Sequence, residues 1–201
     1  MAVSRRMGPA NAVTRTTLMD ATEAVMREEG YAAVTSRRVA ERAGVNQQTV
    51  YYYFETMEDL LLATYRRRIQ TVLEKVERAL ASERPLHAFW HATSDPFDAA
   101  LTMEYLALAN HNEQIRRETV EFGERLRRLE GERLAHRIDD CGDAAAGGPL
   151  GIVMAITYIG YLLGFESTLG LQGGHRDVRL LVEAWLRRLE PAGTRPKAVS
   201  A

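Results

Sequence analysis

The sequence predicts an all-α protein with an N-terminal three-helix head and a larger C-terminal helical bundle. Apolar residues recur at three- and four-residue spacing along most of the 201-residue chain, which is the period of an amphipathic helix. Two short helical segments meet at Gly44, inside residues 35–60. The composition is 46% hydrophobic, which is enough to bury a substantial core. These observations predict a small head of about forty residues, which follows an N-terminal arm, and one larger domain.

Residues 1–16 are predicted to be a flexible basic arm. Gly8 and Pro9 discourage an early helix, and Arg5, Arg6 and Arg15 give the segment positive charge. Such an arm could contact nucleic-acid phosphates or enter a minor groove, or it could be an untethered tail.

The first helix is predicted to begin at Thr17 and to support the two helices that follow. Leu18, Ala21 and Val25 lie on one stripe, and Gly30 ends the helix. We expect the head to span residues 17–60.

The second and third helices read as a helix-turn-helix. Thr35 is a good N-cap for the second helix, and Gly44 supplies the left-handed residue that ends it. Asn46 then caps a third helix that runs to Phe54. A pair of short helices joined by a glycine turn is typical of this DNA-binding motif.

The exposed face of the third helix carries side chains suited to DNA. Gln47 and Gln48 lie in its first turn, and a glutamine amide can pair with adenine as both donor and acceptor. Side chains with hydroxyl or guanidinium groups flank the same surface and suit phosphate oxygens: Thr35, Arg37, Thr49, Tyr51 and Tyr52. The alternative is a helical corner with a solvated polar face, which three consecutive tyrosines make less favourable.

Fixed spacings across three helices resemble the signature of the tetracycline-repressor (TetR) family. The matching strings are Gly30-Tyr31, Val34-Thr35, the segment from Val39 to Val45 and the segment from Thr49 to Phe54, within about residues 17–62. The resemblance implies a homodimeric transcription regulator, most often a repressor, that binds a palindromic DNA operator and a small-molecule effector.

Two residues depart from the family pattern. Met57 stands where the family usually has a phosphate-binding lysine, and Arg38 stands where an acid often completes the capping box. Because methionine has no charge, the resemblance does not extend to the contact that this lysine makes with the DNA backbone.

Charge and cysteine content limit the class of protein. The net charge is −1, while residues 1–68 hold ten basic and eight acidic residues, so any DNA-binding field must be local. Cys141 is the only cysteine, which excludes an intrachain disulfide and fits the cytoplasm. The N-terminus has no signal-peptide apolar run. The uncharged segment 150–165 is shorter than a membrane span, so we expect a buried helix and no membrane partner.

The C-terminal domain is predicted to span residues 61–190, followed by a tail at 191–201. Thr56 caps a long fourth helix that ends at Ser82–Pro85. Further helices are expected at 86–93, 96–110, 113–138, 149–169 and 177–189.

The last two of these helices are the expected dimer surface. Gly160 and Gly164 permit close helix approach, while Leu181 and Trp185 supply apolar area. Symmetry supports this, since two heads on a dyad double the DNA contacts. Alternatively, the two helices complete the core of the monomer.

The middle helices offer candidates for a mainly apolar effector cavity. Glu104 and His111 would supply polar groups within a set that comprises Phe89, Trp90, Met103, Glu104, Tyr105, Leu108, His111, Phe122, Tyr158, Tyr161 and Phe165. Any of the aromatic or methionine residues could equally be plain core.

No cofactor and no metal are predicted. His87 and His91 have metal-ligand spacing with Asp95 one turn later, but they lack the glutamate of the HExxH pattern. No GxSxG, P-loop or GxGxxG string occurs. The alternatives to a ligand-responsive regulator are therefore an α-helical enzyme or metal-binding protein that uses the C-terminal cavity, and a constitutive DNA-binding protein without an effector.

Overall fold

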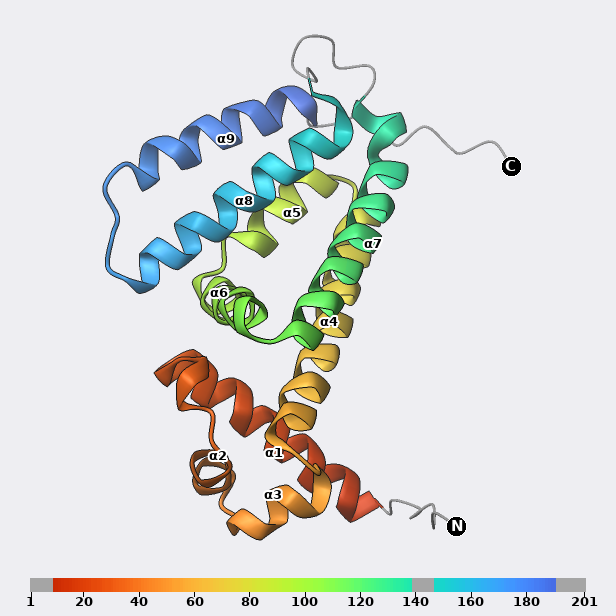
Figure 1. The fold of residues 1–201 in the computed structure, drawn as a ribbon. Helices are drawn as coiled ribbons and strands as arrows, with labels where there is room; N and C mark the ends of the chain where they lie inside the picture. The colour runs from red at the N-terminus through yellow and green to blue at the C-terminus, as the bar shows by residue number, and fades with distance from the viewer. Residues whose placement is uncertain (1–8, 139–146, 191–201) are drawn as a thin grey trace. The chain divides into compact units, whose positions relative to one another are not determined.

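The protein is all-α. The computed structural model describes residues 9–138 and 147–190, and within these ranges it contains helices and no strand. The elements in chain order are α1 (Pro9–Glu29), the 3-10 helix η1 (Tyr31–Ala33), α2 (Ser36–Ala43), α3 (Gln47–Tyr53), α4 (Met57–Leu80), α5 (Pro85–Thr93), α6 (Pro96–His111), α7 (Glu113–Ile138), α8 (Gly148–Thr168) and α9 (His175–Leu189) (Figure 1). The predicted fold class is confirmed, and most helix ends fall within two residues of their predicted positions. The predicted tail lies outside the described residues.

The chain divides into two compact units. The first comprises Met1–Ile69 with Glu104–Arg117, and the second comprises Gln70–Met103 with Glu118–Ala201. Consequently α4, α6 and α7 each contribute residues to both units.

The first unit is built on a small apolar core shared by α1, α2, α3 and the start of α4. Its buried members are Leu18, Met19, Ala21, Val39, Ala40, Val50, Phe54 and Leu60. The helical stripes therefore face one another, and burial of these side chains holds the three-helix head together.

The start of α1 differs from the sequence prediction. The helix begins at Pro9, so the part of the expected flexible arm from residue 9 to residue 16 is helical, and residues 1–8 lie outside the described range. Proline is compatible with the first position of a helix because its missing N–H is not needed there. The added turns contact the end of α3 and the residue that follows it: the Tyr53 hydroxyl donates to Asn11 Oδ1 at 3.0 Å, and the Arg15 guanidinium lies 4.8 Å from the Phe54 ring centroid.

The second unit is centred on α5, α8 and α9, with α8 and α9 forming a helical hairpin (Figure 1). Its core is large and apolar: Val76, Ala79, Leu86, Phe89, Trp90, Leu134, Ile152, Val153, Ile156, Leu163, Val182, Leu186 and Leu189. The helix predicted at 177–189 begins two residues earlier, at His175, whose Nε2 lies 2.8 Å from a carboxylate oxygen of Glu166 on α8.

Two glycines let α8 approach its neighbours closely. A Cβ at Gly160 would lie 3.0 Å from Thr93 Cβ on α5, and one at Gly164 would lie 2.8 Å from Ala99 Cβ on α6. Both glycines are buried. Their close contacts are therefore made inside the second unit, which corrects the expectation that they face a second copy of the chain.

Helix α8 is the one described helix that is long and apolar enough to cross a membrane by length and composition. One of its faces packs into the core through residues such as Ile152, Val153 and Ile156. The other carries the exposed Tyr158 and Leu162. The predicted buried helix is therefore buried on one face only.

Candidate nucleic-acid interface

Helix caps fix the turn between α2 and α3. The Thr35 hydroxyl accepts from the Arg38 N–H at 3.2 Å, and Asn46 Oδ1 accepts from the Thr49 N–H at 2.9 Å. Gly44 has a φ of 67°, in the left-handed region, so its N–H can bond back to the carbonyl oxygens that end α2. The predicted caps and the predicted glycine turn are confirmed.

A serine that the sequence analysis did not select ties the two helices together. Ser36, in the first turn of α2, is buried, and its Oγ accepts from Gln47 Nε2 at 2.7 Å and from the Tyr51 hydroxyl at 3.1 Å. Two of the predicted DNA-contacting side chains thus already have a partner inside the head. Their immediate effect is to position α3 on α2.

The remaining polar side chains of α3 differ in the contacts that they already make within the head. Gln48 is exposed and has no hydrogen-bond partner among the described residues. The Tyr52 side chain is 58% exposed and packs edge-on against the Tyr53 ring, with centroids 5.1 Å apart. The Thr49 hydroxyl donates to Asn46 Oδ1 at 2.9 Å. Gln48 is therefore the α3 side chain best placed to form new hydrogen bonds without breaking old ones.

The three arginines of α2 are not equivalent. The Arg38 guanidinium pairs with Glu29 at 2.7 Å, and Arg42 pairs with Glu28 at 2.6 Å. The hydrogen bond from Arg38 lowers the pKa of Glu29 below its ordinary value and raises the pKa of Arg38 in turn. Arg37 is exposed and has no partner within the described ranges. Because α3 carries no charged side chain, Arg37 is the α2 cation available to a phosphate.

Four residues predicted to line an effector cavity belong to the first unit: Glu104, Tyr105, Leu108 and His111. Glu104 Oε2 accepts from the backbone N–H of Tyr31 at 2.7 Å, and the His111 ring stacks on the Tyr31 ring with centroids 6.0 Å apart. These two expected polar groups for ligand orientation are thus engaged with η1. Their predicted role in ligand binding remains untested.

Tyr105 is the most unusual of these four residues. Its side chain is buried, its ring lies 4.8 Å from that of Tyr65, and its hydroxyl has no hydrogen-bond partner among the described residues. Burial, assisted by the nearby negative charge of Glu23, raises the pKa of Tyr105. Leu108 is also buried.

The other seven predicted cavity residues belong to the second unit. Phe89 and Trp90 are buried members of its apolar core. They therefore fit the alternative in which the aromatic residues of this set form part of the core. Tyr158 is 52% exposed, and its hydroxyl accepts from the Arg127 guanidinium at 3.0 Å. The half-buried residues of the set are Met103, Phe122, Tyr161 and Phe165.

The histidine pair does not form a metal site in the described structure. His87 Nδ1 lies 2.8 Å from a carboxylate oxygen of Glu190, whereas His91 is exposed. Among the described residues no group of three or more His, Cys, Asp or Glu side chains is arranged to hold a metal ion.

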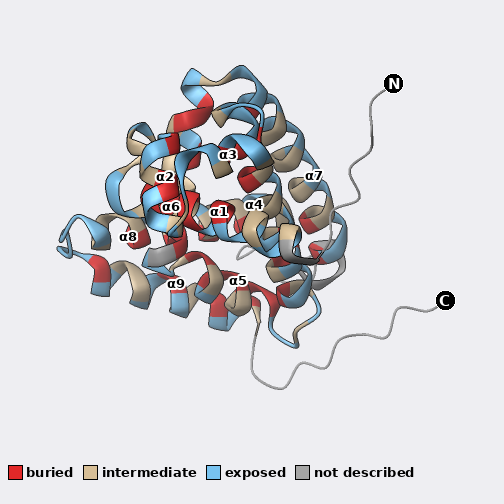
Figure 2. Ribbon diagram, turned by 90° about the horizontal axis from the view of Figure 1, so that it is seen from below, coloured by how far each residue is buried: buried red, intermediate tan, exposed pale blue. Residues whose placement is uncertain are grey.

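The remaining predicted dimer residues lie on α9. Leu181 is 70% exposed, and Trp185 is half-buried against the core. Exposed and buried positions alternate along this helix, as Figure 2 shows. The outer surface of α8, α9 and the segment between them carries further exposed apolar side chains: Tyr158, Leu162, Leu169, Leu171 and Leu180.

Comparisons with known proteins agree on the family. Residues 18–64 match the family model described as bacterial regulatory proteins, tetR family. Over 146 residues, covering 67% of this chain and 72% of the relative, the chain is 30% identical to the HTH-type transcriptional regulator BetI of Rhizobium meliloti. Over 65 residues it is 40% identical to the HTH-type transcriptional repressor KstR of Mycolicibacterium smegmatis, and this match covers 32% of each chain. The chain thus spans about a third of the length of some curated relatives that it matches.

A solved structure shows the same fold over nearly the whole chain. The transcriptional regulator from Saccharomonospora viridis, crystallised with choline, has a TM-score of 0.71 and is 15% identical, with 92% of this chain and 100% of that chain covered. At that identity the likeness concerns the fold alone. Together with the helix-turn-helix geometry and the match to BetI, it establishes that this chain belongs to the TetR family of bacterial transcriptional regulators.

Proposed function

We propose that this regulator is a cytoplasmic repressor that binds a palindromic DNA operator as a homodimer and is released by a small-molecule effector. The structure of the head is the observation that supports DNA binding. It presents an exposed glutamine on α3 and an exposed arginine on α2 that have no partner among the described residues, while Ser36 fixes the angle between these helices. The repressor mode is supported by the name of one relative, the repressor KstR.

Gln48 is the proposed base reader. Its amide can donate to and accept from one adenine in the major groove. Gln47 is less free to turn towards a base, since one N–H of its amide nitrogen is held by Ser36, which leaves its second N–H and its Oε1. The proposed phosphate contacts are made by Thr35, Arg37, Thr49, Tyr51 and Tyr52.

Arg37 supplies the clearest electrostatic contact. The other two arginines of α2 already neutralise glutamates, so their charges are partly cancelled at the protein surface. An unpaired arginine that binds a phosphate releases a counterion, and this makes the affinity salt-dependent.

Operator binding tests these assignments together. Gln48→Ala should cost about 1 to 3 kcal/mol and relax base preference at one position per half-site. Arg37→Ala should weaken binding to all sequences alike and reduce the salt slope by about one. The matched control is Arg42→Ala, which removes an arginine of the same helix that is paired with Glu28. Equal salt slopes for the Arg37 and Arg42 variants would refute the assignment of Arg37.

Dimerisation through the outer surface of α8 and α9 is the second part of the proposal. The exposed apolar side chains on this surface need a partner, and a second copy of the chain would cover them with the same residues across a two-fold axis. A dimer would also place two α3 helices on successive turns of DNA, roughly 34 Å apart.

Sedimentation of a Leu181→Glu variant tests the interface. Leu181 is 70% exposed in the subunit, so a glutamate there should leave the subunit folded while placing charge in the dimer contact. Monomers with weakened operator binding are the expected result. A variant that remains a dimer would place the interface on another surface.

Effector control is the third part. The S. viridis relative binds choline, which supports a small-molecule site in the C-terminal helices of this chain as well. A ligand that favours the conformation unsuited to DNA weakens operator binding, and by linkage the operator weakens ligand binding by the same factor. A coupling of about 1 to 3 kcal/mol changes operator affinity roughly 5- to 150-fold.

A further inference from the structure

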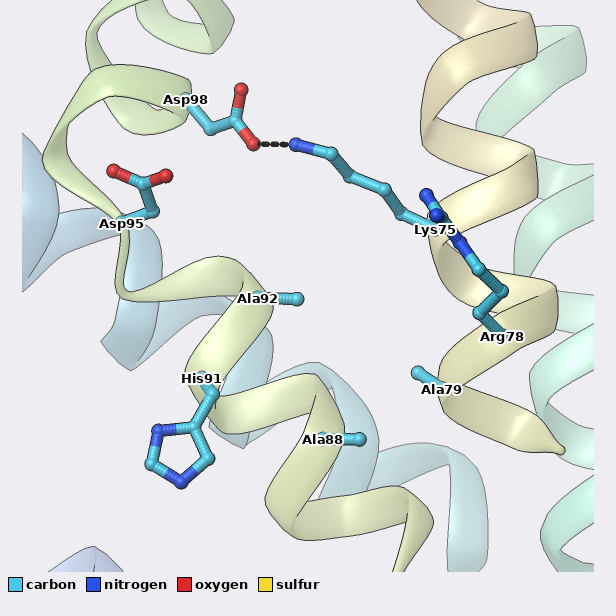
Figure 3. A pocket seen from close by; sticks show the side chains of 8 residues that line it. All are labelled: Lys75, Arg78, Ala79, Ala88, His91, Ala92, Asp95 and Asp98. Atoms are coloured by element: carbon cyan, nitrogen blue, oxygen red, sulfur yellow. Dashed lines mark hydrogen bonds and ion pairs between the residues drawn. The ribbon is translucent and has the colours of Figure 1, made fainter. Parts of the chain in front are cut away.

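The second unit contains a hollow that none of the predicted ligand residues lines. It lies between α4 and α5, has a volume of about 380 Å³ and opens to solvent (Figure 3). Its volume lies within the range of small-molecule sites, which begins at roughly 300 Å³.

Small side chains create this hollow. Ala79 on α4 faces Ala88 and Ala92 on α5, as Figure 3 shows. Three methyl groups leave room between two neighbouring helices that leucines at the same positions would fill. The floor of the hollow is thus apolar and suits a short hydrocarbon or aromatic body.

An ion pair closes one end of the hollow. The Lys75 ammonium on α4 bonds to Asp98 Oδ2 in the first turn of α6 (Figure 3). The Asp98 side chain is 10% exposed, whereas that of Lys75 is 37% exposed. The carboxylate is therefore neutralised where it is buried, and the lysine remains within reach of solvent.

Apart from the ion pair between Lys75 and Asp98, the α4 side of the hollow carries the positive charge of Arg78. Arg78 Nε donates to the Glu74 carbonyl oxygen at 3.1 Å, and the two terminal nitrogens of Arg78 have no partner in the described part of the chain. Asp95, at the turn between α5 and α6, already has an interaction of its own. A free guanidinium beside a lysine favours an anion, and carboxylates fit the guanidinium fork with two parallel hydrogen bonds.

We propose that this hollow binds a small organic carboxylate, with its apolar body on the three alanines and its carboxylate held by Arg78 and Lys75. The inference rests on the proposed effector control and names the chemical class of the effector. The ligand carboxylate competes with Asp98 for Lys75. Because weakening the Lys75 ion pair of a nearly buried carboxylate is costly, ligand binding favours a rearrangement of Asp98 and the first turn of α6. Occupancy of the hollow thereby changes the link between α4 and α6.

Three probes of one shape and different charge test the proposal on the full chain. Benzoate, benzamide and benzamidine share a ring and carry negative, neutral and positive groups. Calorimetric titration at up to about 10 mM ligand detects a Kd of about 1 mM. Benzoate should bind at least about tenfold tighter than the other two, since hydrogen bonds to charged groups are worth that factor or more. Absence of benzoate binding, or a preference for benzamidine, would overturn the proposal.

Substitutions in the hollow test whether the probes bind there. Arg78→Gln should weaken benzoate at least about tenfold and leave benzamide unchanged. The matched control is Arg187→Gln, at an exposed position of α9 in the same unit, which should leave all three probes unchanged. Ala92→Leu should block all three by filling the hollow. Benzoate affinity that survives Arg78→Gln and Ala92→Leu would place the site elsewhere and refute the assignment.

Operator binding separates this proposal from the proposed function. If benzoate fails to bind while the ligand-free protein binds its operator, the hollow is refuted and the repressor stands. If benzoate binds in the hollow and operator affinity does not change, the site stands and effector control through it fails.

Discussion

Glu130 is a buried carboxyl group that should make the stability of the protein depend on pH. It lies on α7 midway between Leu126 and Leu134, four residues from each, and both leucines pack into the core of the second unit. The side chain is 5% exposed. Burial raises the pKa of Glu130 from its ordinary value of 4.5 to about 7, although the charge of Arg127 acts in the opposite direction.

The sign of the effect follows from the direction of the shift. Below pH 4.5 both the folded and the unfolded chain carry this proton, and Glu130 does not lower the stability of the fold. Between pH 4.5 and about 7 the unfolded chain releases the proton while the folded chain retains it, so rising pH favours unfolding. Above this range the loss is complete. It amounts to about 3 kcal/mol, since each tenfold change in proton affinity corresponds to about 1.4 kcal/mol.

Glu130→Gln removes this titration and keeps the size of the side chain. The free energy of unfolding of the variant, measured relative to wild type by urea denaturation, should rise by about 3 kcal/mol between about pH 4 and pH 8. Protein concentration is held constant, because self-association also stabilises the fold. Glu132→Gln, an exposed change on the same helix, is the control and should show little such dependence. A difference between Glu130→Gln and wild type that is the same at every pH would refute the argument.

Three further substitutions test close packing and the head. Gly160→Ala should lower the free energy of unfolding by about 1 to 3 kcal/mol, because the new methyl group meets Thr93. Gly151→Ala in the same helix meets nothing within 4 Å and should raise it by about 0.5 to 1 kcal/mol, as urea denaturation can show. Ser36→Ala removes the acceptor shared by Gln47 and Tyr51, so operator affinity should fall by about 1 kcal/mol or more in a binding titration. Unchanged affinity would mean that this contact does not position α3.

Local signals in the sequence are enough to predict α2 and α3, although not the start of α1. Thr35, Gly44 and Asn46 act within one helical turn of their own positions, so their side chains and backbone angles determine where α2 and α3 start and stop. Helical periodicity is likewise read from residues that are three or four positions apart in the chain. These features depend on neighbours in the chain, which a single sequence displays directly.

The partners of polar side chains could not be predicted in the same way. Glu104 binds the Tyr31 backbone from a position 73 residues away, and Gly160 packs against Thr93. Helical spacing shows which residues share a face but not which helix that face meets. On chemical character alone, the sequence therefore assigns Glu104 to a ligand and Gly160 to a second subunit.

The long-range bond between Glu104 and Tyr31 has a consequence for experiments that exchange or isolate parts of the protein. The first unit is discontinuous in sequence, because Glu104–Arg117 belongs to it together with the residues before Gln70. A fragment that stops at Ile69 would lose the carboxylate that holds η1 and would uncover Tyr65, which is 6% exposed and contacts Tyr105. A chimaera that grafts this head onto another regulator must therefore carry the end of α6 and the start of α7 with it. The piece that can be moved is thus two segments of chain, although the motif that reads DNA occupies only one.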